Sequence, residues 1–187
     1  DQYNSHDNVE AHYVSTGPEI WEQTEGQLTH FVCGIGTGGT FSGAAKFFKE
    51  KNPAIQCIAV DPEGSVFTDY IRNNEVVEGY DYMVEGIGSD VITDALYPDL
   101  VDEVITISDR DSFNRARLIA RAEGICGGGS SGSVAKAIEI VASRLNKDAL
   151  IIGIFADAGI RYLSKCFNDN WMRRHGYLTT TEESIAK

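Results

Sequence analysis

The feature that most constrains the fold is a glycine-rich segment between an apolar run and a helical pattern. Residues 28–33 form a short apolar, β-branched run, and the glycines of residues 34–39 follow directly. Apolar residues then recur at helical spacing over residues 41–51, Pro53 ends the helix, and residues 55–60 predict a second strand. Two strands joined through a helix in this way are expected to lie parallel.

The later part of the chain continues this alternation. Residues 103–107 predict a strand, and residues 108–111 form an S-x-x-D capping box that opens a helix ending at Gly124. Apolar residues at helical spacing predict another helix over residues 134–145, and the near-continuous apolar run 150–155 indicates a strand covered on both faces. The fold class predicted is α/β, with a mostly parallel, twisted sheet and helices on both faces.

Two regions are less regular. Between the second and third predicted strands, residues 82–84 predict a short strand and residues 86–88 a tight turn. After Trp171 the chain becomes polar, and residues 179–187 predict a solvated tail or the start of a linker.

The charge of the chain excludes two classes of partner. It carries 28 Asp and Glu residues against 16 Lys and Arg, a net charge of −12. Binding to nucleic acid without sequence preference needs a basic surface, and an anionic membrane surface would repel this chain. The longest apolar stretch is broken by a glycine and is too short to cross a bilayer. We therefore expect small molecules or other proteins as partners, and neither nucleic acid nor membrane.

The four cysteines lie singly and far apart, and neither they nor the histidines show the spacing of metal ligands. No metal site is expected. Cys33 and Cys57 lie in apolar runs and are predicted to be core residues. Together with the lack of a basic start followed by an apolar run, this pattern predicts a reducing, cytoplasmic setting.

The first glycine motif, residues 36–40, lies between a predicted strand and its helix. Such a loop exposes backbone N–H groups where the helix dipole is positive, which suits a phosphate, and its threonine hydroxyls add donors. A tight turn that only needs positive φ is the alternative. Gly34, Gly36 and Gly39 also match the dinucleotide fingerprint, with Asp61 where such a fold binds ribose. The motif predicts a phosphate site and leaves the ligand open.

The second glycine motif contains Gly128-x-Ser130-x-Gly132, the pattern of a hydrolase nucleophile elbow, and Asp157 and His175 follow in the hydrolase order. An elbow needs a strand before its serine, whereas a helical segment precedes this one. A glycine-rich start to a long helix better suits a second cofactor contact, because the Ser130 hydroxyl can donate or accept a hydrogen bond.

With Glu85-Gly86-Ile87-Gly88 as a third motif, the order and separation of the three resemble the pyridoxal-phosphate enzymes of the cysteine synthase/cystathionine β-synthase family. The resemblance runs over residues 1–178, and residues 60–65, 84–88 and 171–178 are more similar to the cystathionine β-synthase branch. It implies two α/β lobes with the cofactor between them. This chain resembles the later part of that catalytic domain, a tryptophan-synthase-β-like cofactor-binding lobe, with the earlier lobe missing.

The resemblance also implies roles for individual residues. Ser130 would hydrogen-bond the pyridine nitrogen of the cofactor, with Asp157 in the segment near that nitrogen. The residues implied to hold the cofactor phosphate are Gly36, Thr37, Gly38, Gly39 and Thr40. The residues implied to face the reacting amino acid are Gln2, Tyr3 and Gly86.

The reaction that the resemblance implies is β-replacement on L-serine through an aminoacrylate, in which the thiol of homocysteine adds and cystathionine forms. A neutral hydroxyl at the pyridine nitrogen suits this chemistry, because it cannot hold that nitrogen firmly protonated. Cysteine synthesis from O-acetylserine and sulfide is the alternative within the family. The family tendency further implies a homodimer.

The chain departs from the family pattern in several places. The Schiff-base lysine of the family lies upstream of the Gln-Tyr pair, and none of the lysines here matches it, so this chain alone is predicted to be inactive. Ser89 stands where the β-synthases commonly have tyrosine, and Ala156 and Ala158 replace a proline and a serine. These departures leave the second substrate open. They also leave open a non-catalytic interaction or regulatory relative and a nucleotide-binding Rossmann domain.

Overall fold

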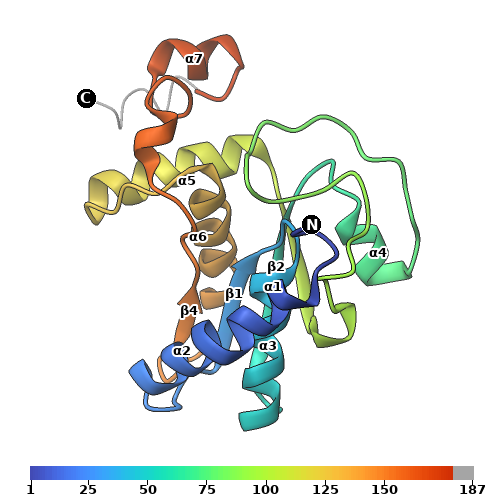
Figure 1. The fold of residues 1–187 in the computed structure, drawn as a ribbon. Coiled ribbons are helices and arrows are strands. Elements are labelled where there is room, and N and C mark those ends of the chain that lie inside the picture. The colour runs from blue at the N-terminus through green and yellow to red at the C-terminus, as the bar shows by residue number, and fades with distance from the viewer. Residues whose placement is uncertain (179–187) are drawn as a thin grey trace.

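The computed structural model describes residues 1–178, and the predicted tail or linker lies outside this range. At its centre is a four-stranded sheet in the order β3-β2-β1-β4, in which every neighbouring pair is parallel (Figure 1). The strands are β1 (His30–Gly34), β2 (Gln56–Pro62), β3 (Glu103–Ile107) and β4 (Ile151–Gly153). The prediction of an α/β fold with a parallel sheet is confirmed.

The β1–α3–β2 unit lies where the glycine-rich segment predicts it. Strand β1 pairs with β2 from His30 opposite Gln56 to Gly34 opposite Val60, and the connecting helix is α3 (Gly39–Lys51). The three central residues of β1 are buried because helices cover both faces of the sheet. Cys33 and Cys57 are buried core residues, as predicted.

One face of the sheet is covered by α3 and the N-terminal helices (Figure 1). Aromatic residues dominate the packing there: the rings of Phe31 and Phe48 lie 5.1 Å apart, edge to face, and Phe41 is also fully buried. The N-terminal helices are α1 (His6–Ala11), the π-helical turn η1 (His12–Thr16) and α2 (Gly17–Gln23).

The other face is covered by α6 (Gly129–Ala142), which packs Val134, Ala137 and Val141 against the sheet. Helix α5 (Asp109–Ala122) lies across α6. The two helices approach closely at Gly132, where an added Cβ would lie 1.9 Å from the carbonyl oxygen of Ser112. The glycines and serines at the start of α6 therefore serve close packing as well as any ligand.

A third cluster of buried residues joins α5 to the C-terminal part of the described chain, at the upper end of the molecule in Figure 1. Phe113 packs there with Tyr162 and Met172. The remaining elements are α4 (Phe67–Asn73), η2 (Pro98–Leu100), η3 (Gly159–Tyr162) and α7 (Asp169–Arg174). No helix within residues 1–178 combines the length and the apolar character needed to span a membrane.

The prediction of a short strand at residues 82–84 is wrong. The backbone N–H groups of Met83 and Val84 donate to the carboxylate of Asp109, at 2.8 and 2.9 Å, instead of to a neighbouring strand. The turn at residues 86–88 is confirmed, with φ of +87° at Gly86 and +80° at Gly88.

Candidate active site

A cavity of about 450 Å³ opens where β1 ends, between the two helix layers. The helix after β1 lies on one face of the sheet, and the helix that leads into β4 lies on the other. In α/β sheets, ligands bind at such a switch point, outside the carboxyl ends of the strands. The predicted site residues that line this cavity are Gln2, Tyr3, Gly36, Thr37, Gly38, Thr40, Gly86 and Ser130.

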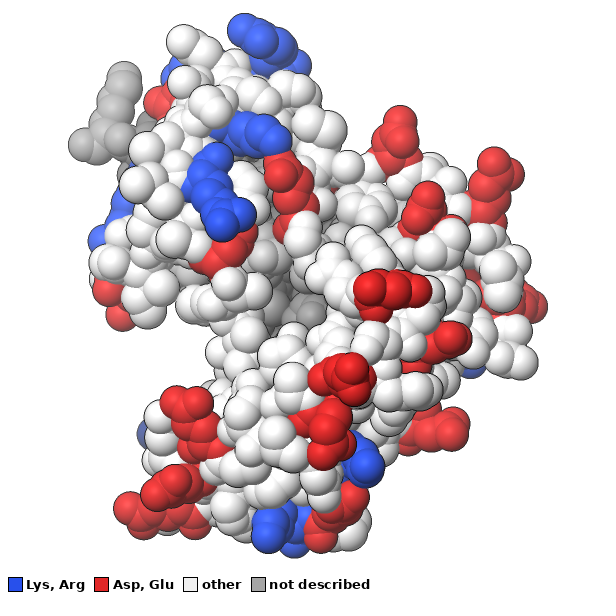
Figure 2. Space-filling model, viewed as in Figure 1, with Lys and Arg blue, Asp and Glu red and all other residues white. Residues whose placement is uncertain are grey.

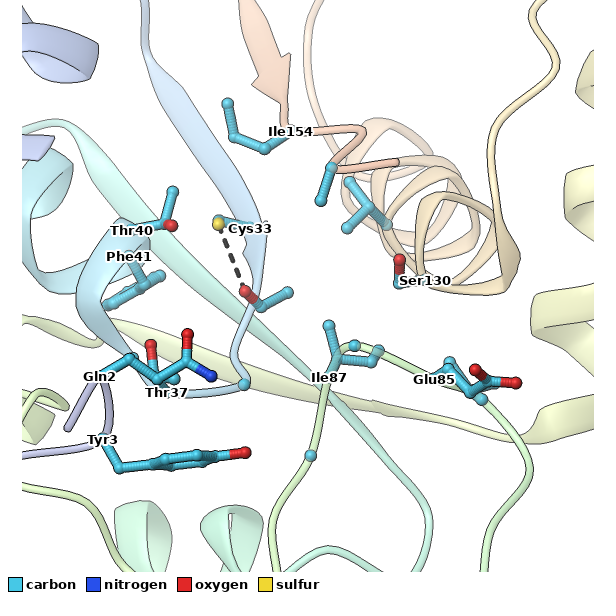
Figure 3. A pocket seen from close by; sticks show the side chains of 18 of the residues that line it. Gln2, Tyr3, Cys33, Thr37, Thr40, Phe41, Glu85, Ile87, Ser130 and Ile154 are labelled. Carbon is cyan, nitrogen blue, oxygen red and sulfur yellow. Dashed lines mark hydrogen bonds between the residues drawn. The ribbon is translucent and has the colours of Figure 1, made fainter. Parts of the chain in front are cut away.

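The first glycine loop forms one wall of the cavity (Figure 3). Gly38 is the N-cap residue of α3 with φ of +90°, and the first hydrogen bond of the helix runs from Ser42 N–H to the Gly38 carbonyl, at 2.8 Å. The amides of the preceding turn have no partner within the helix, so they are available to an anion. The glycines also make room: a Cβ at Gly38 would lie 2.6 Å from Cα of Leu96.

Three polar side chains from outside the loop fix its shape. Asn8 donates to the Thr37 hydroxyl at 2.9 Å, and Thr93 donates to the Thr37 carbonyl at 2.7 Å. His12 shares a hydrogen bond of 3.0 Å with the hydroxyl of Thr40, and burial lowers the pKa of its ring. Sequence reasoning missed these residues as parts of the site, because single polar residues in helices or loops carry no pattern that points to a loop elsewhere in the chain.

Gly39 of the loop does not line the cavity. It faces the Asn8 side chain, so closely that an added Cβ would lie 2.2 Å from its amide oxygen. The N–H of Gly39 donates to the Thr37 hydroxyl at 3.3 Å. Within the predicted loop, Gly39 therefore allows the loop to pack against α1, while its neighbours line the cavity.

Ser130 lies in the first turn of α6, across the cavity from the loop (Figure 3). The residue is 4% exposed, and it lines the cavity together with the apolar residues Val134 and Ile87. A buried hydroxyl at the edge of an apolar wall can make one directed hydrogen bond to a ring atom.

Gln2, Tyr3 and the turn around Gly86 enclose the cavity from the other sides (Figure 3). The turn is held against the first loop by a hydrogen bond of 2.7 Å from Gly88 N–H to the Ile35 carbonyl. A Cβ added at Gly86 would meet nothing within 4 Å, whereas one at Gly36 would lie 2.7 Å from the Gly86 carbonyl oxygen. The turn therefore lies against the loop and leaves open space on its other side.

The charges around the cavity favour an anion at the loop rather than elsewhere. Among the described residues that line it, Glu85 is the one charged side chain, and it forms an ion pair with Lys165. Figure 3 shows its carboxylate directed away from Thr37 and Thr40. The surface seen in Figure 2 carries acidic side chains over much of the molecule, with basic ones in its upper part and at its lower end.

Asp157, expected near the cofactor ring, does not line the cavity, although its neighbour Ala156 does. Its Oδ2 accepts a hydrogen bond of 2.5 Å from the hydroxyl of Tyr162, and its buried Oδ1 has no partner among the described residues. Burial and this carboxylate raise the pKa of Tyr162. The carboxylate lies against Gly128, the N-cap residue of α6.

Asp61 of the dinucleotide fingerprint and His175 of the nucleophile-elbow pattern contact other parts of the protein instead of the cavity. Asp61 is fully buried and accepts two hydrogen bonds from Thr68, at 2.9 Å from its N–H and 2.7 Å from its hydroxyl. It is therefore turned into the protein, away from any ribose. His175 lies at the end of α7 against Trp171 and Tyr177, and an irregular segment rather than a strand precedes Ser130. Neither a dinucleotide site nor a nucleophile elbow fits these positions.

The fold and the site together define a class: an α/β lobe in which a glycine-rich loop at a helix start faces a serine hydroxyl across a cavity of small-molecule size. The chain matches the family model for pyridoxal-phosphate dependent enzymes over residues 1–157. It belongs to the pyridoxal-phosphate dependent enzyme family, whose cofactor is pyridoxal phosphate.

Relatives in this family carry three different names. The chain is 40% identical to a cystathionine beta-synthase of Apis mellifera over 178 residues, which are 95% of this chain and 35% of that protein. It is 39% identical to cysteine synthase B of Escherichia coli (strain K12) over 167 residues, 88% of this chain and 50% of that protein. It is 35% identical to an O-acetylserine dependent cystathionine beta-synthase of Bacillus subtilis (strain 168) over 164 residues, 88% of this chain and 51% of that protein. The chain thus spans between a third and about half of the length of these relatives.

The residues present fit this cofactor. The cavity volume of about 450 Å³ is that of a small-molecule site. Backbone amides at the start of α3 suit the phosphate, and the glycines there allow Leu96 and Asn8 to pack directly against the loop. The Ser130 hydroxyl offers one hydrogen bond to the ring from the opposite wall. None of the lysines within residues 1–178 lines the cavity.

Proposed function

We propose that the protein containing this chain catalyses β-replacement on L-serine with homocysteine, forming cystathionine. The observation that carries the proposal is the single cavity that brings together the loop of residues 36–40, Ser130, and the predicted substrate residues Gln2, Tyr3 and Gly86. The similarity to the Apis mellifera cystathionine beta-synthase over 95% of the chain supports the choice of reaction.

In this proposal the chain binds and orients, and the lysine of the family comes from outside these residues. The amides of residues 36–40 that the Thr37 hydroxyl does not already occupy would hold the phosphate, and Ser130 would meet the ring nitrogen with a neutral hydroxyl. Pyridoxal phosphate, when bound, supplies the electron sink that loss of the serine hydroxyl requires. Gln2 and Tyr3 face the amino acid, and the open side of Gly86 leaves room for it. The chain alone is inactive, and the complete protein works as a homodimer in the cytoplasm.

A second reaction is supported by a specific observation. The chain is 39% identical to cysteine synthase B of Escherichia coli over 88% of its length. Ser89, which stands where the β-synthases commonly have tyrosine, is buried, and its hydroxyl donates to the Val91 carbonyl at 2.7 Å. It offers no aromatic group to the substrate. Cysteine formation from O-acetylserine and sulfide is therefore the competing function.

The test is an assay of the full-length protein that carries this sequence, with two substrate pairs. We expect bound pyridoxal phosphate, seen by its absorbance, and cystathionine from serine and homocysteine. If the protein turns over O-acetylserine with sulfide but not serine with homocysteine, the cysteine synthase reaction replaces the proposed one. A full-length protein that retains no pyridoxal phosphate would contradict both reactions and favour a non-catalytic relative.

A further inference from the structure

Helix α6 begins without a capping side chain of its own. Its N-cap residue is Gly128, which makes no side-chain cap, and its first turn contains no acidic residue. A helix start of this kind leaves its first amides and its positive dipole end without a local negative group. A carboxylate from a distant part of the chain lies beside this helix start.

Asp157 lies directly against this helix start. Gly128 N–H donates to the backbone carbonyl of Asp157 at 3.2 Å, and Gly127 forms an isolated antiparallel bridge with Ala158. A Cβ added at Gly128 would lie 2.2 Å from Oδ1 of Asp157 and 2.5 Å from the ring of Tyr162. The carboxylate and the phenol ring thus leave no space between themselves and the backbone of Gly128.

Tyr162 holds the carboxylate in this place. Its hydroxyl donates to Oδ2 of Asp157 at 2.5 Å, and the residue is 8% exposed within the cluster that joins α5 to the C-terminal part of the described chain. Asp157 is half-buried, with its Oδ1 atom buried, and leaving such a carboxylate without its single donor is costly. The hydrogen bond therefore fixes the position of Asp157, and with it the backbone of residues 127 and 128.

Ser130 follows two residues after Gly128, so the position of its hydroxyl depends on where the helix begins. Neither Asp157 nor Tyr162 lines the cavity, whereas Ser130 and Ala156 do. We propose that Asp157 and Tyr162 are a positioning pair, which clamps the first turn of α6 and thereby sets the Ser130 hydroxyl against the ring of the cofactor. This inference rests on the proposed function.

The test compares two tyrosines of the same cluster in the full-length protein with bound pyridoxal phosphate. Tyr162→Phe removes the hydroxyl that holds Asp157. Tyr177→Phe removes a hydroxyl that donates to a different carboxylate, Asp109, at 3.1 Å, and is the matched control. We expect Tyr162→Phe to shift the absorbance and emission of the bound cofactor and to lower kcat about 10-fold with little change in KM, as for loss of one directed hydrogen bond. Tyr177→Phe should lower Tm without moving the cofactor spectrum.

A double variant separates positioning from plain stability. If the pair acts through Ser130, then Tyr162→Phe should change neither the spectrum nor kcat further once Ser130→Ala is in place. Asp157→Ala, which removes the acceptor of the Tyr162 hydroxyl, should shift the spectrum in the same direction and serves if Tyr162→Phe does not fold.

The outcomes distinguish this inference from the proposed function. An unshifted cofactor spectrum in both Tyr162→Phe and Asp157→Ala, or effects that add fully to those of Ser130→Ala, would overturn the positioning pair while the function stands. A wild-type protein that binds no pyridoxal phosphate would overturn the function, and this inference with it.

Discussion

The start of α3 and the start of α6 look alike in sequence and differ in what covers them. Both helices begin after a glycine N-cap, Gly38 and Gly128, and neither has a side-chain cap. At α3 the N-cap residue Gly38 lines the cavity, whereas at α6 Gly128 lies against the carboxylate of Asp157 and Gly129 packs against Phe113. A carboxylate already present at a helix N-terminus leaves no place there for a second anion. The packing around each of these two glycine-rich helix starts therefore decides which of them has room for a phosphate.

The two starts also contribute different groups to the cavity. The first contributes Gly36 and Gly38 with the hydroxyls of Thr37 and Thr40, and the second contributes one hydroxyl, that of Ser130. The start of α3 therefore suits a negatively charged phosphate, and the start of α6 suits an uncharged ring atom. Mutations at the two starts should accordingly separate retention of the cofactor from turnover.

The largest effect is expected at the first start. Gly38→Asp adds a negative charge where the phosphate is expected, and its Cβ would lie 2.6 Å from Cα of Leu96 in a backbone with φ of +90°. These costs together should weaken cofactor affinity at least ~100-fold. Gly124→Asp is the control, since it adds the same charge at a positive φ where nothing lies within 4 Å. Equal cofactor occupancy in the two variants, measured by absorbance after dialysis, would show that the phosphate lies elsewhere.

An intermediate effect is expected at the second start. Ser130→Ala should leave the cofactor bound but lower turnover roughly 10-fold, because it removes one hydrogen bond to the ring and none to the phosphate. Ser143→Ala, at the other end of α6, removes a hydroxyl that donates to the Ile140 carbonyl and should leave turnover unchanged. Loss of cofactor from Ser130→Ala, without loss of turnover per bound cofactor, would assign Ser130 to retention instead.

The smallest effect on the cofactor is expected at Asp61, outside both helix starts. Burial raises the pKa of its carboxyl group to about 6 from 3.8, so the folded protein binds a proton in this window that the unfolded chain has released. The free energy of unfolding should therefore fall by about 1–3 kcal/mol as pH rises from 4 to 6, in addition to the contributions of other groups. Asp61→Asn should remove this part of the pH dependence of the free energy of unfolding and leave cofactor affinity unchanged.

Denaturation at several pH values measures this component, and Asp99→Asn, at an exposed position, is the control. A pH dependence that is the same in the wild type and in Asp61→Asn would contradict the effect of burial. Saturable binding of NAD that disappears on substitution of Asp61 would support a dinucleotide site.

Much of this architecture could be predicted from local pattern. The strand–loop–helix–strand unit around residues 36–40 follows from apolar periodicity and glycine placement, which report on nearby residues. The helix predicted over residues 134–145 is also present, but it begins and ends earlier, at Gly129–Ala142. The strand expected at residues 82–84 was wrong, because the side chain of Asp109 takes the backbone donors of Met83 and Val84. A competitor 25 residues away or more leaves no trace in the pattern of the run itself.

The supports of the site could not be predicted for the same reason. Asn8 and His12 reach the threonines of the loop from 29 and 28 residues away, and Thr93 reaches it from 56. Each is a single polar residue whose partner is set by tertiary packing. The role of Asp157 differs again: the resemblance places it near the ring, and the structure adds that Tyr162 and Gly128 are its immediate neighbours.

The most direct test of the difference between the two helix starts is a crystal structure of the full-length protein with pyridoxal phosphate bound. The phosphate oxygens should lie within hydrogen-bonding distance of the backbone amides of residues 36–40, with Ser130 next to the ring nitrogen. A phosphate at the start of α6, or anywhere away from residues 36–40, would contradict this account.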